Sequence, residues 1–229
     1  SYLSVIESLH HAGFKNQVKV DIKLIDSENI NRENAKEKLK NIQGIIVPGG
    51  FGKRGIEGMI ETIKYARENK IPFLGICLGM QMSVIEFARN VLKLKDANSE
   101  EFDEKTKNPV IHIMKEQIGI DKKGGTMRLG AYPCILKEKS LAKELYDKEK
   151  ISERHRHRYE YNNEYRERLE ETGLICSGIS PDGKLVEIVE LQNHPYFIAS
   201  QFHPELKSRP TNPAPLFLGL VEAAKKIKF

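Results

Sequence analysis

A cysteine held between two glycines is the most chemically informative feature of this sequence. Residues 72–81 read Pro-Phe-Leu-Gly-Ile-Cys-Leu-Gly-Met-Gln. The continuous apolar run before Cys77 is typical of a buried strand, and the apolar residues after Met80 recur at helical spacing. Gly75 and Gly79 permit the tight backbone of a strand-to-helix turn, and a helix N-terminus favours a thiolate. The pattern predicts that Cys77 is a nucleophile at such a turn.

A second motif, far along the chain, provides a base for this nucleophile. A lone cysteine is more often a small core residue, so a partner is needed to favour catalysis. His203, Pro204 and Glu205 directly follow the apolar stretch 196–202. Side chains two residues apart on extended backbone point the same way, so Glu205 is expected to orient His203. His203 would then take and return protons for Cys77, as in a catalytic triad.

A glycine-rich turn offers donors for an oxyanion. Residues 47–52 read Val-Pro-Gly-Gly-Phe-Gly and follow an expected strand at 44–47. Free backbone amides in such a turn can stabilise the negative charge that develops on a carbonyl oxygen under attack. We expect the amide of Gly50 to form one half of an oxyanion hole and the amide of Leu78 to form the other half.

These motifs, in this order, resemble class I (triad) glutamine amidotransferase domains. Three further stretches resemble the glutaminase domain of CTP synthase: Ile-Glu-Phe-Ala-Arg-Asn (85–90), Gly-Gly-Thr-Met-Arg-Leu-Gly (124–130) and Glu-Arg-His-Arg-His-Arg-Tyr-Glu (153–160). The similarity runs from about Ser4 to about Ala224. It implies a glutaminase that hydrolyses L-glutamine through a cysteine thioester and supplies ammonia for the ATP-dependent amination of UTP to CTP.

The resemblance also assigns roles that spacing alone does not. It implies that the glutamine pocket is lined by Leu78, Gly79, Met80 and Gln81. It further implies that Glu101 holds the α-ammonium group of glutamine and that Arg158 pairs with the α-carboxylate, a task suited to a bidentate guanidinium. The plain alternatives are a helix-surface glutamine for Gln81, an ordinary acidic loop residue for Glu101 and a structural arginine for Arg158.

Further binding partners follow from the same resemblance. Family members carry an N-terminal synthetase domain, to which nothing in residues 1–229 corresponds, so the whole sequence is expected to be one glutaminase domain. ATP and Mg would bind in that synthetase domain, and no cofactor is expected in this one. GTP is the expected allosteric activator, acting near Phe51 and the loop before Gly124. The full-length enzyme is expected to be a homotetramer.

Composition narrows the class of protein. The 229 residues suffice for one sizeable α/β domain. No stretch approaches the ~20 apolar residues of a membrane span, and the N-terminus lacks a signal sequence. The cysteines Cys77, Cys134 and Cys176 are widely spaced, which favours the reducing cytoplasm, and we expect the last two to be core thiols. The net charge of +5 is modest and its charges are interleaved, which argues against nucleic-acid binding.

The run 153–160 invites two other interpretations. Strand alternation would place Arg154, Arg156 and Arg158 on one face and His155, His157 and Tyr159 on the other. The histidines lack a carboxylate or cysteine at the spacing of a metal site, so no metal is expected. The arginines lack an aromatic stacking platform, which disfavours RNA binding.

Hydrophobic periodicity predicts the elements that must position these residues. The first half alternates helices and strands: helix 2–11 ending at Gly13, strand 18–25, helix 31–40, strand 44–47, helix 56–69, strand 71–76 and helix 80–92. The second half is mostly strands, at 110–114, 130–136, 152–161, 174–179, 185–191 and 196–202, with polar loops at 98–108 and 116–125 and a closing helix at 213–227.

This order predicts an α/β fold with a mostly parallel central sheet flanked by helices. The resemblance makes it a flavodoxin-like class I glutamine amidotransferase fold with an additional antiparallel β region. The sequence begins on the helix that would follow a first strand, so that strand is expected to be missing.

Three alternatives stay open. One is another class I amidotransferase, serving the synthesis of GMP, carbamoyl phosphate or aminobenzoate. Another is a catalytically silent regulatory module of the same fold, which loss of Cys77, His203 or Glu205 would indicate; all three are present. The last is a basic RNA-binding domain.

Overall fold

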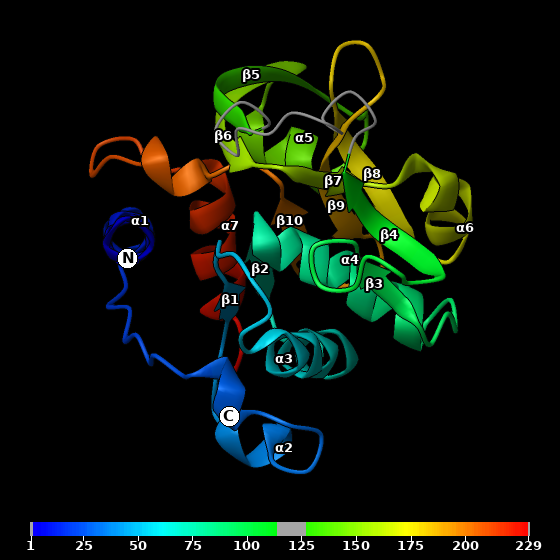
Figure 1. Cartoon of the computed structure of the whole chain (residues 1–229). Helices are drawn as coiled ribbons and strands as arrows, with labels where there is room; N and C mark the ends of the chain where they lie inside the picture. The colour runs from blue at the N-terminus through cyan, green and yellow to red at the C-terminus, as the bar shows by residue number, and fades with distance from the viewer. Residues whose placement is uncertain (1, 114–126, 229) are drawn as a thin grey trace.

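Two β-sheets form the frame of the computed structural model, which describes residues 2–113 and 127–228 (Figure 1). The larger sheet has seven strands in the order β1-β2-β10-β9-β8-β5-β6, and the smaller has the order β3-β4-β7. The strands are β1 (Ile45–Val47), β2 (Phe73–Ile76), β3 (Ala97–Ser99), β4 (Asn108–Ile113), β5 (Arg128–Leu136), β6 (Lys150–His157), β7 (Tyr159–Tyr161), β8 (Leu174–Ile179), β9 (Val186–Leu191) and β10 (Phe197–Ser200). The α-helices are α1 (Leu3–Asn16), α2 (Ala35–Lys38), α3 (Ile56–Glu68), α4 (Leu78–Asn90), α5 (Leu141–Tyr146), α6 (Arg166–Glu171) and α7 (Pro215–Ala224).

The larger sheet is mixed. β2 pairs in parallel with β1 and with β10, whereas the pairs β10–β9, β9–β8, β8–β5 and β5–β6 are antiparallel. The predicted parallel sheet and the predicted antiparallel region are therefore both present, and they join at β10 into one continuous sheet. Every residue of β2 and β10 is buried, as expected of strands covered by helices on both faces.

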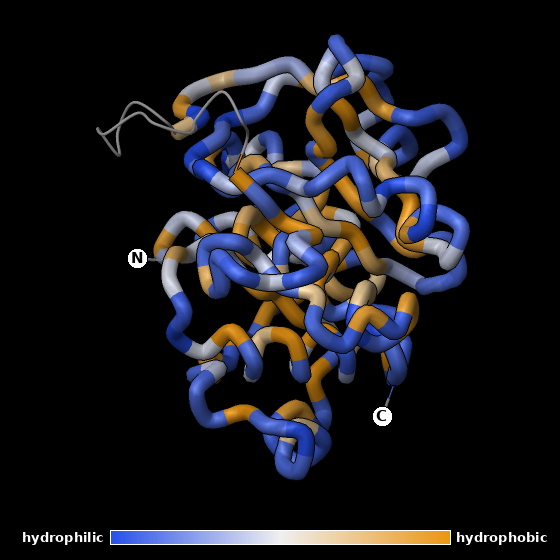
Figure 2. The backbone as a smooth tube through the Cα atoms, turned by 45° about the vertical axis from the view of Figure 1, so that its right-hand side comes forward, coloured by the Kyte–Doolittle hydropathy of each residue, from blue (hydrophilic) through white to orange (hydrophobic). Residues whose placement is uncertain are grey.

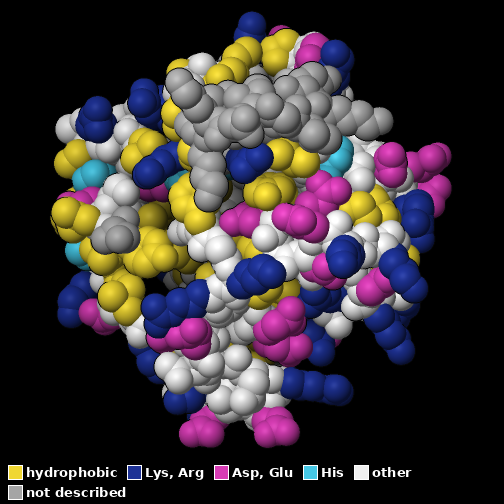
Figure 3. All heavy atoms as spheres, in the orientation of Figure 1, with side chains coloured by type: hydrophobic (Ala, Val, Ile, Leu, Met, Phe, Trp, Pro, Cys, Tyr) yellow, Lys and Arg dark blue, Asp and Glu magenta, His cyan; other side chains and the backbone are white. Residues whose placement is uncertain are grey.

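Helices cover both faces of the parallel part. Phe73 of β2 belongs to the apolar cluster that includes α3 and α4, whereas Leu74 belongs to the cluster that includes α1 and α7. This alternation along one strand fixes which helix lies on which face. Figure 2 shows the apolar segments, in orange, concentrated in the interior of the fold. On the face drawn in Figure 3, basic and acidic side chains are interspersed, in keeping with the interleaved charges of the sequence.

The predicted strand 18–25 is wrong. The segment is extended, and half-exposed Val18, Val20 and Ile22 alternate with exposed residues, but it pairs with no strand of the described chain. It runs apart from β1 (Figure 1), and a cavity of about 1070 Å³ is lined by this segment, by β1 and by α7. A strand requires a hydrogen-bonded neighbour, and sequence alternation alone does not supply one. The missing first strand stays a prediction.

Other boundaries also differ from the prediction. Residues 152–161 do not form one strand, because the chain leaves the larger sheet after His157 and enters the smaller sheet at Tyr159. Helix α1 continues past Gly13 and ends where Gln17 adopts a left-handed φ of 57°. The polar stretch 98–108 includes most of β3, and the loop predicted at 116–125 lies outside the described residues.

Two short helices were not predicted, and one is shorter than predicted. α5 and α6 have six residues each, too few for hydrophobic periodicity to be read with any certainty. The predicted helix 31–40 is reduced to α2, because Asn31 accepts the backbone amides of Glu33 and Asn34 and holds the chain in a turn before the helix.

Candidate active site

Cys77 lies at the turn between β2 and α4, at the carboxyl end of a parallel strand. Its backbone has φ 52° and ψ −102°, a conformation that residues other than glycine rarely adopt. Its amide donates to the carbonyl of Ser200 on the neighbouring strand at 2.7 Å. Backbone strain of this kind persists only where the surroundings enforce it, and it is common at nucleophiles.

Close packing explains the two glycines beside Cys77. A Cβ added to Gly75 would lie 2.8 Å from the Cβ of Ala199, and one added to Gly79 would overlap the carbonyl oxygen of Val47. The first turn of α4 therefore rests directly on β1. Any larger residue at either position would displace the turn that carries the thiol.

The side chains of His203 and Glu205 pair as predicted, although the backbone that carries them is not extended. The Nδ1 of His203 donates to the Oε1 of Glu205 at 2.7 Å. The expected extended backbone is wrong, because Pro204–Leu206 form a short 3₁₀ turn. A Cβ added to Gly49 would lie 2.8 Å from the Cε1 of His203 and 3.5 Å from the Cβ of Cys77, so the imidazole and the cysteine flank the same glycine.

His203 is protonated at neutral pH, as expected of a base that has already taken a proton. Burial opposes a charge on this imidazole, but its interactions with Cys77 and Glu205 outweigh burial and raise the pKa of His203 to about 10. His203 is therefore an imidazolium at neutral pH.

The other two cysteines lie in different surroundings. Burial raises the pKa of Cys176 to about 12 and raises that of Cys134 further, so both stay neutral thiols. Cys134 is fully buried and Cys176 almost fully, each within an apolar cluster.

Gly50 and Leu78 are neighbours, as the predicted oxyanion hole requires. A Cβ added to Gly50 would lie 3.2 Å from the Cδ2 of Leu78. Leu78 is the first residue of α4, so its amide has no carbonyl partner one turn earlier in the helix. That the amides of Gly50 and Leu78 stabilise an oxyanion stays a prediction.

The residues expected around the substrate differ in what they can offer. Gln81 is buried and donates to the carbonyl of Tyr159 at 3.2 Å and to the Oε1 of Gln201 at 3.3 Å, while its own Oε1 has no partner in the described chain. Met80 is fully buried in an apolar cluster, so only its backbone can face a polar substrate. Arg158 is half-buried, and its Nε is enclosed without a partner among the described residues.

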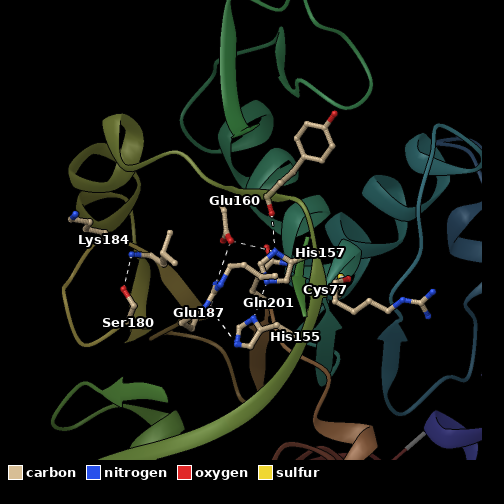
Figure 4. Close-up of polar contacts among 12 residues, drawn as sticks. Cys77, His155, His157, Glu160, Ser180, Lys184, Glu187 and Gln201 are labelled. Atoms are coloured by element: carbon tan, nitrogen blue, oxygen red, sulfur yellow. Dashed lines mark hydrogen bonds and ion pairs between the residues drawn. The ribbon is translucent and has the colours of Figure 1, made fainter. Parts of the chain in front are cut away.

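A buried polar cluster beside the thiol was not identified from the sequence (Figure 4). Arg128 pairs with Glu187 at 2.9 Å and with Glu160 at 3.3 Å. The Nδ1 of His155 lies 2.8 Å from the Nε2 of His157, and the carbonyl of Arg156 between these two residues lies 3.8 Å from the Cys77 sulfur. The predicted alternation along β6 is correct, since its histidines are buried and its arginines exposed. No pattern in the sequence indicates that Arg128 would contact Glu187.

Hydrogen bonding sets the proton positions in the histidine pair. The Nδ1 of His157 donates to the carbonyl of Tyr159, so its Nε2 is the acceptor for the Nδ1–H of His155. Burial, reinforced by the charge of Arg128, lowers the pKa of His155 to about 2 and that of His157 to about 3. Burial also raises the pKa of Glu160 to about 8. Both histidines are therefore neutral and are unsuited to act as bases at neutral pH.

This neutral pair predicts a pH-dependent mutational effect. A histidine whose pKa is lowered on folding stabilises the protein relative to the unfolded chain above pH 6.5, and this contribution is lost as the pH falls below that value. The cost of His155→Asn should therefore be about 2 kcal/mol smaller at pH 5 than at pH 7, measured as the difference in free energy of unfolding in urea. The matched control is Arg154→Gln, on the exposed face of the same strand. Its effect on the free energy of unfolding should be the same at pH 5 and pH 7. An equal cost of His155→Asn at both pH values would contradict a neutral buried histidine.

Among the described residues, no group of three or more histidine, cysteine or acidic side chains could hold a metal ion. None of the helices described is long and apolar enough to cross a membrane.

Comparison with known proteins agrees with this geometry. A family model for the class-I glutamine amidotransferases matches residues 1–223. The chain belongs to the class-I glutamine amidotransferase family. The predicted fold class and family are thereby confirmed.

Within the class-I glutamine amidotransferases, several CTP synthases are similar to this chain over its whole length. The chain is 59% identical over 228 residues to the CTP synthase of Caldanaerobacter subterraneus subsp. tengcongensis, covering 100% of this chain and 42% of that protein. It is 61% identical over 230 residues to the CTP synthase of Fibrobacter succinogenes, covering 100% of this chain and 40% of that protein. The chain thus spans about two fifths of the length of these relatives.

Solved structures point the same way. The glutaminase domain of Trypanosoma brucei CTPS, determined with bound acivicin, has a TM-score of 0.93 and 39% identity, covering 100% of this chain and 89% of that one. A putative GMP synthase subunit from Thermoplasma acidophilum shares the fold, with a TM-score of 0.60 and 16% identity. The predicted resemblance to the glutaminase domain of CTP synthase is therefore confirmed.

Proposed function

We propose that this chain hydrolyses L-glutamine to glutamate and ammonia, with Cys77, His203 and Glu205 as its catalytic residues. The observation that carries the proposal is the strained turn at Cys77, which places the thiol beside an imidazole already paired with a carboxylate. A buried structural cysteine needs neither the strain nor the charged partner. The matches to glutaminase domains support the same reaction.

The first half of the reaction releases ammonia. The Cys77 thiolate attacks the carbon of the side-chain carboxamide and forms a sulfur–carbon bond. The amides of Gly50 and Leu78 stabilise the resulting oxyanion, and each such donor is worth roughly 3 kcal/mol in comparable sites. His203 gives its proton to the amide nitrogen, the carbon–nitrogen bond breaks, and ammonia leaves. A γ-glutamyl thioester remains on Cys77.

The second half restores the enzyme. The now neutral His203 takes a proton from water as the water oxygen attacks the thioester carbon. The carbon–sulfur bond breaks, glutamate leaves, and the thiolate and imidazolium are regenerated. Glu205 holds His203 in one orientation through both halves. The sum is glutamine plus water giving glutamate plus ammonium, once the proton of the new γ-carboxylic acid has passed to ammonia through the solvent.

We further propose that the ammonia is used by a synthetase domain of a longer polypeptide, because the relatives are CTP synthases more than twice as long as this chain. By that resemblance, the synthetase domain would bind ATP and Mg and convert UTP to CTP, GTP would activate the glutaminase, and the enzyme would be a cytoplasmic homotetramer. The reactive thiol of Cys77 supports a reducing compartment.

Arg158 gives a prediction that separates substrate binding from synthesis. If Arg158 pairs with the α-carboxylate of glutamine, Arg158→Ala should raise the KM for glutamine by about 10²-fold, since a charge-assisted bidentate pair is lost. CTP formation from free ammonia by the combined domains should be unchanged, because ammonia bypasses this pocket. Arg154→Ala, on the exposed face of β6, is the control. Equal loss of the ammonia-dependent reaction would show that Arg158 is structural.

A direct assay tests the proposed function. Glutamine hydrolysis by the chain is measured alone, and again with a separately produced CTP synthase synthetase domain, UTP, ATP, Mg and GTP. We expect slow hydrolysis by the chain alone and CTP formation by the combined domains. Hydrolysis without any CTP formation would favour another class I amidotransferase, and no hydrolysis under either condition would favour a catalytically silent module.

A further inference from the structure

The glycine-rich loop that carries Gly50 packs against Cys77, Leu78 and His203, and one side chain holds it by a hydrogen bond. The amide of Gly52 donates to the Oε1 of Glu101 at 2.9 Å. Within the described part of the chain, this is the only hydrogen bond found for residues 49–52. Gly52 has a left-handed φ of 82°, and Phe51 beside it is 59% exposed. A short loop rich in glycine has many accessible conformations, so the hydrogen bond that holds one of its amides helps to decide where the neighbouring amides point.

Glu101 is itself held in a fixed position. It follows β3, and its amide donates to the hydroxyl of buried Ser99 at 3.2 Å. The strand is attached to α4 by the guanidinium of Arg89, which donates to the carbonyl of Ala97 at 2.7 Å. Since α4 begins directly after Cys77, the carboxylate of Glu101 links the loop to the same rigid element that carries the nucleophile.

We infer that Glu101 is a positioning residue for the oxyanion hole as well as a ligand for the substrate. This inference rests on the proposed function. One carboxylate oxygen holds the amide of Gly52, and the other is left for the α-ammonium group of glutamine. Gly50, the expected oxyanion donor, is only two residues from Gly52 and packs against Leu78. One carboxylate therefore connects the charged end of the substrate to the group that stabilises its reacting end.

If Glu101 positions the oxyanion hole, its loss should lower the rate at which Cys77 is acylated. A residue that only binds the ammonium group contributes equally to the ground state and the transition state, so its loss raises KM and leaves kcat unchanged. The aiming of an oxyanion donor, in contrast, affects only the transition state, and loss of such a donor costs roughly 10²–10³ in rate. The ammonium group, by fixing the carboxylate, would help to fix the loop.

A substrate without the amino group separates the two roles. 4-Carbamoylbutanoate has the same reacting amide as glutamine but offers nothing for Glu101 to bind. With this substrate at saturation, we expect Glu101→Ala to lower the rate of ammonia release by about 10²-fold. Glu101→Gln keeps an acceptor oxygen for the amide of Gly52, so its rate of ammonia release should fall less than that of Glu101→Ala. Glu104→Gln, an exposed acidic residue nearby, is the control and should match the unsubstituted chain.

Two further measurements complete the test. Alkylation of Cys77 by iodoacetamide is a direct displacement that forms no oxyanion, so its rate should be the same in all variants. Hydrogen exchange of the Gly52 amide should be faster in Glu101→Ala because its acceptor is gone. The inference is overturned if Glu101→Ala leaves the reaction of 4-carbamoylbutanoate unchanged, or if iodoacetamide reactivity falls by the same factor as acylation. If the unsubstituted chain does not react with glutamine, the proposed function fails, and unchanged exchange at Gly52 would still refute the role of Glu101.

Discussion

Cys77→Ala or Cys77→Ser is expected to reduce glutamine hydrolysis by at least about 10⁴-fold, because removal of a catalytic nucleophile eliminates the covalent route. Cys134→Ala and Cys176→Ala should keep most of the activity. The reason is the environment of each thiol: Cys77 lies on a strained turn beside a protonated imidazole, whereas burial keeps the other two neutral.

Chemical labelling checks the same assignment without relying on turnover. A diazoketone analogue of glutamine should alkylate one residue, and peptide mapping should locate the modification at Cys77. Prior incubation with glutamine should slow the reaction. Modification of Cys134 or Cys176 in the folded chain would contradict the assignment.

Glu205→Gln is expected to lower the rate of acylation by about 10²–10⁴-fold, as in other triads whose orienting carboxylate is replaced. The amide cannot balance the charge of the imidazolium, so the pKa of His203 should fall from about 10 toward its usual range. An NMR titration of the His203 ring in both proteins measures this shift directly. Glu222→Gln, on the exposed surface of α7, is the control.

The stability of the Glu205→Gln variant gives an independent check on the direction of the His203 pKa shift. His203 has a raised pKa in the folded chain, so its contribution is fully present below pH 6.5 and is lost as the pH rises through about 10. The difference in free energy of unfolding between the unsubstituted chain and Glu205→Gln should therefore shrink between pH 7 and pH 10. A difference that grows over this range would show that His203 is not the imidazolium described above.

Local patterns were sufficient to predict the strand-to-helix turn that carries Cys77. The apolar run before Cys77, the helical periodicity after it and the two flanking glycines are all contained in one short segment. The structure adds the reason for the glycines, which is contact with Ala199 and Val47. The pairing of His203 with Glu205 was also predicted correctly, although the proline between them starts a 3₁₀ turn that extended geometry did not anticipate.

Several features that depend on contacts between distant parts of the chain were not predicted. The alternation of residues 18–25 is that of a strand, but no strand of the described chain pairs with it. The contact between Arg128 and Glu187 joins residues 59 positions apart, and the break at Arg158 reflects the junction of two sheets. Glu101 was assigned through family resemblance, and its bond to Gly52 could not be read from sequence.

If Cys77 forms a γ-glutamyl thioester, trapping the acyl group during the first turnover should place it on this residue. The chain is mixed with isotopically labelled glutamine, quenched with acid within the first turnover, digested and analysed by mass spectrometry. We expect a labelled glutamyl group on the peptide that contains Cys77, formed with the release of one equivalent of ammonia and absent from Cys77→Ala. Release of ammonia with no acyl group on Cys77, or an acyl group on another residue, would contradict this mechanism.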